Sequence, residues 1–146
     1  MGRSSKDRRS KGPLDYTLEE LDGERWGEPT FNSYVVTTCH AVRRKPLRTL
    51  TPEELRLVIG QAIGLPWLVP LALALLREDP LRCASLYHGD LLSSVVRIPA
   101  AHWAEHPYEK AQLVDDILPR ARRDPEATEL PEDATAAIRL LIGTAD

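Results

Sequence analysis

Apolar residues recur along this chain at intervals of three and four, the spacing that places side chains on one face of an α-helix. The clearest series begins at Thr51, where an N-cap residue, a proline and two glutamates precede apolar positions that reach Ile63. A second series opens at Pro66 and runs to about Glu78. It is apolar on nearly all sides, so we expect this helix at the centre of the core, with Pro70 early enough to be tolerated.

Shorter segments repeat this spacing nearer the N-terminus. Thr17 and Glu20 match a capping box, and Gly23 can end the helix that follows. Residues 33–45 contain good strand formers, but the spacing of their apolar residues favours a helix. The buried face predicted for this helix consists of Tyr34, Val35, Thr38, Cys39 and Val42.

The C-terminal half shows three further helical patterns. Asp90 is positioned to cap a helix that reaches Ile98. Pro107 opens a longer helix, in which Pro119 either introduces a kink or ends it. Residues 131–142 form a last amphipathic helix. No segment alternates in the manner of a strand, so we predict an all-α, single-domain bundle of about six or seven short helices.

Charge divides the chain of 146 residues into two parts. Residues 1–13 carry five basic residues and one acidic residue, and they include no large apolar residue between Met1 and Pro13. We predict that they form a disordered basic tail. The remaining 14 basic and 21 acidic residues give residues 14–146, the predicted helical domain, a net charge of −7. An acidic domain argues against nucleic acid as the main partner, and it favours either plain solubility or a basic protein partner.

Composition indicates an ordinary soluble domain of the cytoplasm. A chain of 146 residues buries enough surface to fold without disulfides or a structural metal. Its two cysteines, Cys39 and Cys83, are expected to be reduced thiols. The longest apolar stretch, residues 62–76, contains two prolines and falls short of the roughly 20 residues of a bilayer span. We expect neither a signal peptide nor a membrane segment.

Candidate chemistry is sparse. His102 and His106 lie four residues apart, so a helix would place both imidazoles on one face, as a zinc site requires. We find no third ligand nearby in the sequence and expect no metal and no cofactor. Cys39 and His40 are adjacent, and adjacent helical residues point about 100° apart, so they do not form a nucleophile and base pair. We therefore predict that the protein is not an enzyme.

Charged groups are the remaining candidates. Arg43, Arg44 and Lys45 end the predicted helix over residues 33–45, and we expect them at the surface, where cations complement the helix dipole. Acidic residues gather near the two ends of the domain, where they serve either solubility or an interface. They are Glu19, Glu20, Asp22, Glu24 and Glu28 near its start, and Asp115, Asp116, Asp124, Glu126 and Glu129 near its end.

The order of the short motifs resembles a known family. Trp26-Gly27 is followed by Thr38-Cys39-His40 with Arg43-Arg44-Lys45-Pro46-Leu47, then Ile59-Gly60-Gln61, Gly64-Leu65-Pro66, Gly89-Asp90-Leu91-Leu92 and Trp103. This order, over roughly residues 14–118, is similar to that of the immunity proteins of bacterial contact-dependent growth inhibition. The resemblance rests on order and spacing, because none of the motifs is diagnostic alone.

The resemblance implies an intracellular antidote that binds the C-terminal toxin domain of an effector and occludes its active site. Many such toxins are nucleases, whose phosphate-binding surfaces are basic, so an acidic domain suits this partner. The acidic residues named above become the expected toxin contacts, and exposed aromatic residues would serve as anchors. The candidate anchors are Tyr16, Trp26, Tyr87 and Tyr108.

Two other classes of function remain open. A small metal-dependent hydrolase would use His102 and His106 with a carboxylate. A helical regulator would bind nucleic acid through the basic tail, with an affinity that falls steeply with salt.

Overall fold

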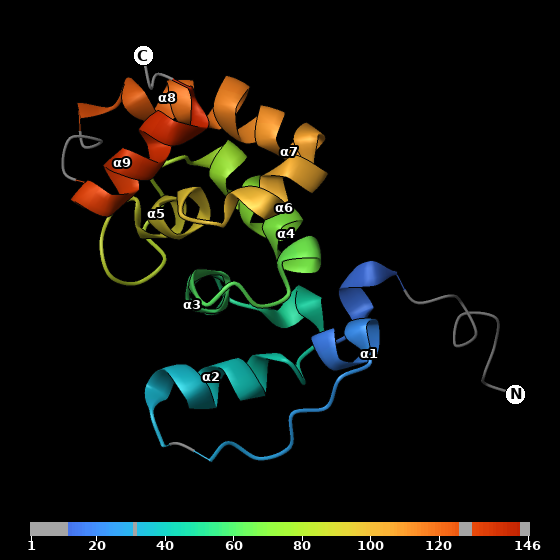
Figure 1. The fold of residues 1–146 in the computed structure, drawn as a ribbon. Helices are drawn as coiled ribbons and strands as arrows, with labels where there is room; N and C mark the ends of the chain where they lie inside the picture. The colour runs from blue at the N-terminus through green and yellow to red at the C-terminus, as the bar shows by residue number, and fades with distance from the viewer. Residues whose placement is uncertain (1–11, 31, 126–129, 144–146) are drawn as a thin grey trace, which may run out of the picture. The chain divides into compact units, whose positions relative to one another are not determined.

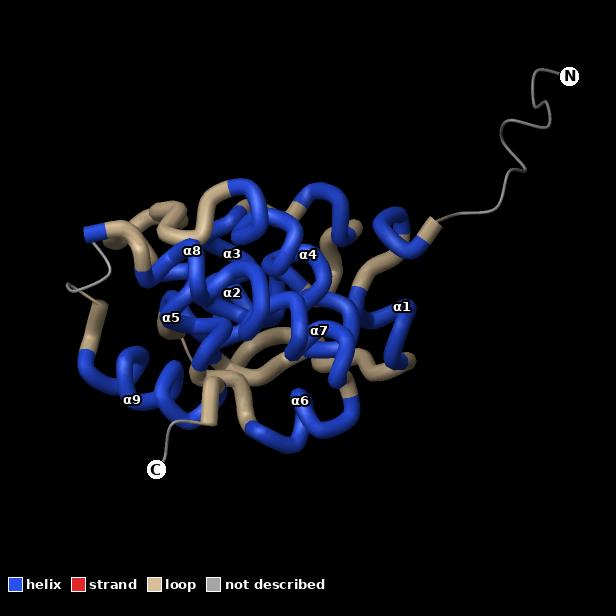
Figure 2. The backbone as a smooth tube through the Cα atoms, turned by 90° about the horizontal axis from the view of Figure 1, so that it is seen from above, coloured by secondary structure: helices blue, strands red, loops and turns tan. Residues whose placement is uncertain are grey.

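The computed structural model describes residues 12–30, 32–125 and 130–143, and its regular elements there are helices (Figure 1). Figure 2 shows these helices joined by loops, without a strand in the described ranges. The predicted all-α class is confirmed. Contacts cluster in two compact units, Met1–Leu50 and Thr51–Asp146.

The first unit consists of short elements held by local capping. These are η1 (Pro13–Asp15), α1 (Leu18–Asp22), α2 (Tyr34–Val42) and η2 (Leu47–Thr49). The predicted capping box at Thr17 is confirmed, because its hydroxyl accepts from Glu20 N and its own N–H donates to Glu20 Oε1. Gly23 ends α1 with φ at 77°, as the sequence indicated. The predicted tail lies outside the described residues except for its last two, of which Pro13 begins η1.

The helix expected over residues 33–45 forms, but its buried face is narrower than predicted. Cys39 and Val42 are buried, which agrees with the expectation. Tyr34 and Val35, at the N-terminal end of α2, are 63% and 37% exposed, so their assignment to the core is wrong. The spacing of apolar residues predicts which face of a helix is buried. How much of the length of that face is buried depends on the elements that pack against it.

The second unit contains the larger core. Its elements are α3 (Pro52–Gly60), α4 (Leu65–Glu78), α5 (Asp90–Val96), α6 (Ala100–Glu105), α7 (Pro107–Ala111), the π-helical segment η3 (Gln112–Ile117), α8 (Leu118–Arg122) and α9 (Glu132–Leu141). α5 packs against α3, α4 and α9, and each of its residues is buried. α4 keeps a row of exposed residues that includes Pro66 and Pro70. The enclosed element is therefore α5, rather than α4 as predicted.

Two helix boundaries differ from the expectation. α3 ends at Gly60 instead of continuing through Ile63, and Gly64, expected as its stop, is the N-cap of α4 with φ at 65°. Pro119 does not end its helix. The chain stays helical through Arg122, with π-helical hydrogen bonding just before the proline. A proline removes an N–H donor from the backbone, and a π-turn is one way for a helix to absorb such an irregularity.

Asp90 organises the loop that precedes α5. The sequence predicted it as the N-cap, but Gly89 occupies that position with φ at 92°, and a Cβ there would lie 2.5 Å from Leu130 Cδ2. Asp90 is the first helical residue and is 2% exposed. Its carboxylate accepts the backbone N–H groups of Ala84, Ser85 and Leu86 at 2.7, 3.1 and 2.8 Å.

The Asp90 carboxylate also lies within an ion network. Arg56 Nε is 3.9 Å from Asp90 Oδ2, and the same guanidinium forms two bonds of 2.7 Å with Glu53. The hydroxyl of Ser85 donates to Glu53 in turn. Burial alone would raise the pKa of the Asp90 carboxyl, but the loop N–H groups outweigh it and lower that pKa.

Among the described residues, no helix combines the length and the apolar character needed to cross a bilayer.

Asp90→Asn is expected to destabilise the protein by about 3 kcal/mol, because an amide cannot accept the loop N–H groups as the carboxylate does. The lowered pKa means that the carboxylate contributes stability above its unfolded pKa of about 4, and that this contribution is lost as pH falls through the folded pKa. Urea unfolding should therefore show a large difference between the two proteins at pH 7 that shrinks below about pH 4.

Asp79→Asn, the same substitution at an exposed loop position, is the control and should change stability by less than about 0.5 kcal/mol. A pH-independent difference for Asp90→Asn would contradict the assigned role of its charge.

Candidate functional site

Two of the predicted toxin contacts of the first unit, Asp22 and Glu24, lie beside a buried arginine, Arg43. Arg43 is 2% exposed, so its expected place at the surface is wrong. Its two Nη atoms donate to the two carboxylate oxygens of Asp22 at 2.9 and 2.8 Å, and Nη2 also donates to the carbonyl of Glu24 at 2.7 Å. The hydrogen bond from Arg43 lowers the pKa of Asp22. Asp22 therefore has a structural partner within the chain.

Trp26, in the loop after α1, contacts the buried side chain of Arg43. The Arg43 guanidinium carbon lies 4.6 Å from the centroid of the indole, within the range of a cation–π contact. His40 meets the same indole edge-on at 5.0 Å, and its Nδ1–H donates to the carbonyl of Gly27 at 3.0 Å. Trp26 remains 36% exposed, so it anchors the loop through Arg43 and His40 rather than from within the core.

The other carboxylates of this group differ in their exposure and in the bonds that they already form. Glu20 is committed to the capping box, and Glu19 lies 3.7 Å from Arg44 with a side chain that is 17% exposed. Glu28 pairs with Arg44 at 3.5 Å, yet its side chain is 86% exposed. Glu24 is exposed, and its bonds within the described part of the chain use its backbone rather than its carboxylate. Glu24 and Glu28 are thus the residues of this group best placed to meet a partner.

The acidic group near the C-terminus lies partly on a continuous helical run formed by α7, η3 and α8. Asp115 and Asp116 are exposed on η3, and Asp116 pairs with Arg120 at 3.2 Å. Asp124 is exposed just beyond α8. Glu126 and Glu129 lie outside the described residues. The same run carries Tyr108, which is 77% exposed, the highest value among the candidate anchors.

An open groove in the second unit was not anticipated. It has a volume of about 540 Å³ and lies between the α5–α6 connection and α9. Trp103 and Leu141 line it, and Leu140, at its side, is 76% exposed. Sequence analysis predicted an amphipathic helix over residues 131–142, but it did not identify Leu140 as an exposed apolar residue of that helix.

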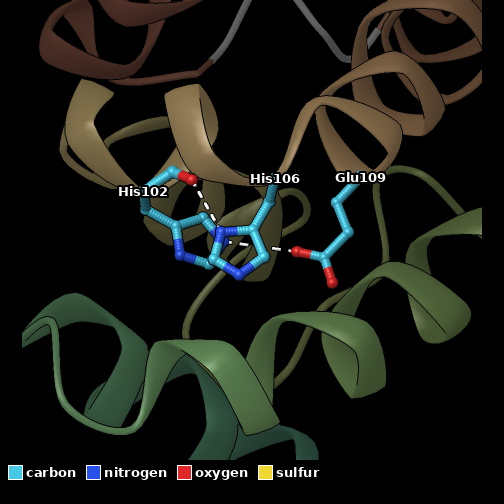
Figure 3. Close-up of side chains that lie close together, drawn as sticks. All are labelled: His102, His106 and Glu109. Carbon is cyan, nitrogen blue, oxygen red and sulfur yellow. Dashed lines mark hydrogen bonds and ion pairs between the residues drawn. The ribbon is translucent and has the colours of Figure 1, made fainter.

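The two histidines noted in the sequence meet a third polar side chain. His102 and His106 stack with ring centroids 4.1 Å apart and planes within 15° of parallel. His102 Nε2 lies 3.3 Å from Glu109 Oε1, and the Nδ1–H of His106 donates to the carbonyl of His102 at 2.7 Å (Figure 3). The expectation that no third ligand is nearby is therefore wrong.

The environment of His102 favours its neutral form. Its side chain is 5% exposed, and burial lowers its pKa first, followed by the neighbouring ring of His106. The hydrogen bond from His102 to Glu109 acts in the opposite direction, but the pKa remains below its ordinary value. Sequence analysis did not identify Glu109 as a third ligand, because it is seven residues from His102. On a single helix this separation would place the two side chains two turns apart.

These features define a small all-α protein with two buried ionic centres and a separate histidine and carboxylate cluster. A family model described as CDI immunity proteins, those of contact-dependent growth inhibition, matches residues 20–113. This match covers more than half of the chain, so the chain belongs to the CDI immunity protein family. The resemblance seen in the motif order is confirmed. No curated protein and no solved structure matches the chain significantly.

Asp22→Ala is expected to destabilise the protein by about 3 kcal/mol, because it leaves the Arg43 charge buried without its partner. Chemical unfolding followed by circular dichroism measures the change. Glu24→Ala removes a neighbouring exposed carboxylate whose side chain forms no bond with the residues that the structure describes, and it should cost less than about 0.5 kcal/mol. Equal effects of the two substitutions would contradict the structural role assigned to Asp22.

Proposed function

We propose that this protein neutralises the toxin domain of a contact-dependent growth inhibition effector by binding it and covering its active site. Membership of the CDI immunity family is the observation that carries the proposal. The protein acts inside the cell and has no turnover of its own. An interface of standard size would cover about 800 Å² on this chain.

We further propose that the toxin is a nuclease with a basic surface. The net charge of −7 on residues 14–146 supports this choice, because nucleases hold phosphate with basic groups and an acidic inhibitor presents carboxylates to the same groups. Long-range attraction would also accelerate the encounter of the two proteins.

The outer face of the helical run from α7 to η3 is the surface we assign to the toxin in the second unit. Tyr108 is a large aromatic side chain that is 77% exposed, and such residues dominate binding energies when a partner covers them. Asp115 follows it by seven residues in the same helical run. Asp115 is exposed, and its carboxylate forms no hydrogen bond or ion pair with the described residues. Asp116 adds a second exposed carboxylate.

This surface is better suited to recognition than the ionic centre at Arg43. Asp22 and Glu20 already satisfy groups of their own chain, so a toxin would have to displace those bonds to use them. Glu24 and Glu28 remain as separate candidate contacts in the first unit, where their exposure leaves them accessible.

Co-expression with the toxin domain encoded beside this chain tests the function. Cells that produce both proteins should grow, cells that produce the toxin alone should die, and the purified pair should form a complex. The inhibited toxin should also lose its activity on DNA or RNA in a purified assay. Equal killing with and without this protein, together with the lack of a complex, would overturn the proposal.

Two substitutions test the assigned surface. Tyr108→Ala should weaken toxin binding by about 2 kcal/mol, or roughly thirtyfold, through loss of a buried anchor. Asp115→Lys should slow association and reduce its dependence on salt. Both are measured by surface plasmon resonance at several salt concentrations, after circular dichroism has shown native helix content.

Glu132→Lys is the matched control, since it makes the same change in net charge at an exposed position of α9. If Glu132→Lys and Asp115→Lys slow association equally, the net charge rather than this face of the helical run steers the toxin.

A further inference from the structure

The turn between α6 and α7 brings together three side chains that commonly bind metals. On one straight helix, His102 and Glu109 would lie about 10 Å apart along the axis. His106 interrupts the helix with φ at −134° and ψ at 61°, and α7 starts at the next residue. α7 consequently packs against α6, and the ligand atoms of His102, His106 and Glu109 all lie within 4.8 Å of one another.

The hydrogen bond of His106 determines which of its nitrogens is available. A carbonyl oxygen only accepts hydrogen bonds, so the proton of the neutral ring is on Nδ1, which faces the carbonyl of His102 at 2.7 Å. Nε2 of His106 therefore carries a lone pair. A backbone carbonyl that accepts from one ring nitrogen is the usual support for a histidine that binds a metal through the other nitrogen.

The spacing of the ligand atoms suits a small tetrahedral ion. Bonds of about 2.0–2.1 Å place two ligand atoms of a tetrahedral zinc ion about 3.4 Å apart. His102 Nε2 and Glu109 Oε1 are already 3.3 Å apart. One ring nitrogen of His106 lies within 4.8 Å of the ligand atoms of the other two side chains, so the ring must approach them further to bind the same ion. Rotation of the His106 ring out of its stack can supply this movement, because the χ2 torsion of histidine has a broad minimum.

We propose that His102 Nε2, His106 Nε2 and a carboxylate oxygen of Glu109 form a binding site for a divalent transition-metal ion, for which Zn²⁺ is the best fit. The ion takes the place of the proton that His102 and Glu109 share, and water completes the fourth position. Two imidazoles and one carboxylate favour zinc over Mg²⁺, which prefers six oxygen ligands. The bound ion braces α6 against α7, and its detection does not depend on the proposed toxin binding.

Cobalt titration of the full-length, metal-free protein tests the site directly. Co²⁺ bound to nitrogen and oxygen ligands in a four-coordinate site gives strong visible absorption, so the bands should saturate at one ion per chain. Zn²⁺ should then displace the cobalt and raise the melting temperature of the native protein, whereas Mg²⁺ should do neither.

Two conservative substitutions identify the ligands. Glu109→Gln keeps a hydrogen-bond acceptor beside His102 but removes the charge, and His106→Gln removes the free ring nitrogen. Each should weaken Co²⁺ binding at least about tenfold while circular dichroism shows native helix content. Glu132→Gln, the same change at an exposed glutamate of α9, should leave the affinity unchanged.

Three results would overturn the proposal. The first is a folded native protein that gives no visible cobalt bands. The second is binding that survives both Glu109→Gln and His106→Gln. The third is near-ultraviolet absorption from sulfur to cobalt that disappears in Cys83→Ser, which would place the ion at the exposed thiol instead. Each of these would leave His102 and Glu109 as a hydrogen-bonded pair that holds α6 to α7.

Discussion

The buried carboxylate of Asp90 is the constraint on which the second unit depends. It stands at the first turn of α5, the helix that contacts α3, α4 and α9, and it binds three consecutive backbone N–H groups of the preceding loop. Because a buried charge is costly unless it is fully bonded, the loop must keep one conformation for α5 to stay enclosed. Gly89 is part of the same constraint, since a side chain there would collide with Leu130.

Arg43 has the equivalent place in the first unit, where a single guanidinium joins Asp22, the backbone of Glu24 and the ring of Trp26. The bonds around Asp90 and Arg43 distinguish two kinds of charged residue. Some stabilise the fold, and others are exposed and available to a partner. Asp22 and Glu20 belong to the first kind, whereas Glu24, Glu28 and Asp115 face solvent. An immunity protein needs both kinds, because a rigid scaffold reduces the entropy lost when its exposed residues bind.

Local sequence chemistry accounted for much of the fold. The capping boxes at Thr17 and Thr51, the C-cap at Gly23 and the helical run of apolar residues after Pro66 all form, because each depends on atoms within about one helical turn. Some helix boundaries were misplaced by a few residues, whereas the predictions about burial failed because of distant partners. Arg43 looked like a surface cation at a helix end, and only its pairing with Asp22, 21 positions away in the sequence, made it a buried residue.

The sequence by itself determined the all-α class, most helix starts, the acidic charge and the order of motifs that places the chain among CDI immunity proteins. Tertiary structure decided which helix is enclosed, which carboxylates remain exposed and whether the two histidines have a third neighbour. Periodicity and capping are short-range properties that a sequence displays directly. The approach of Glu109 to His102 depends instead on the change of chain direction at His106, a backbone geometry that no residue spacing encodes.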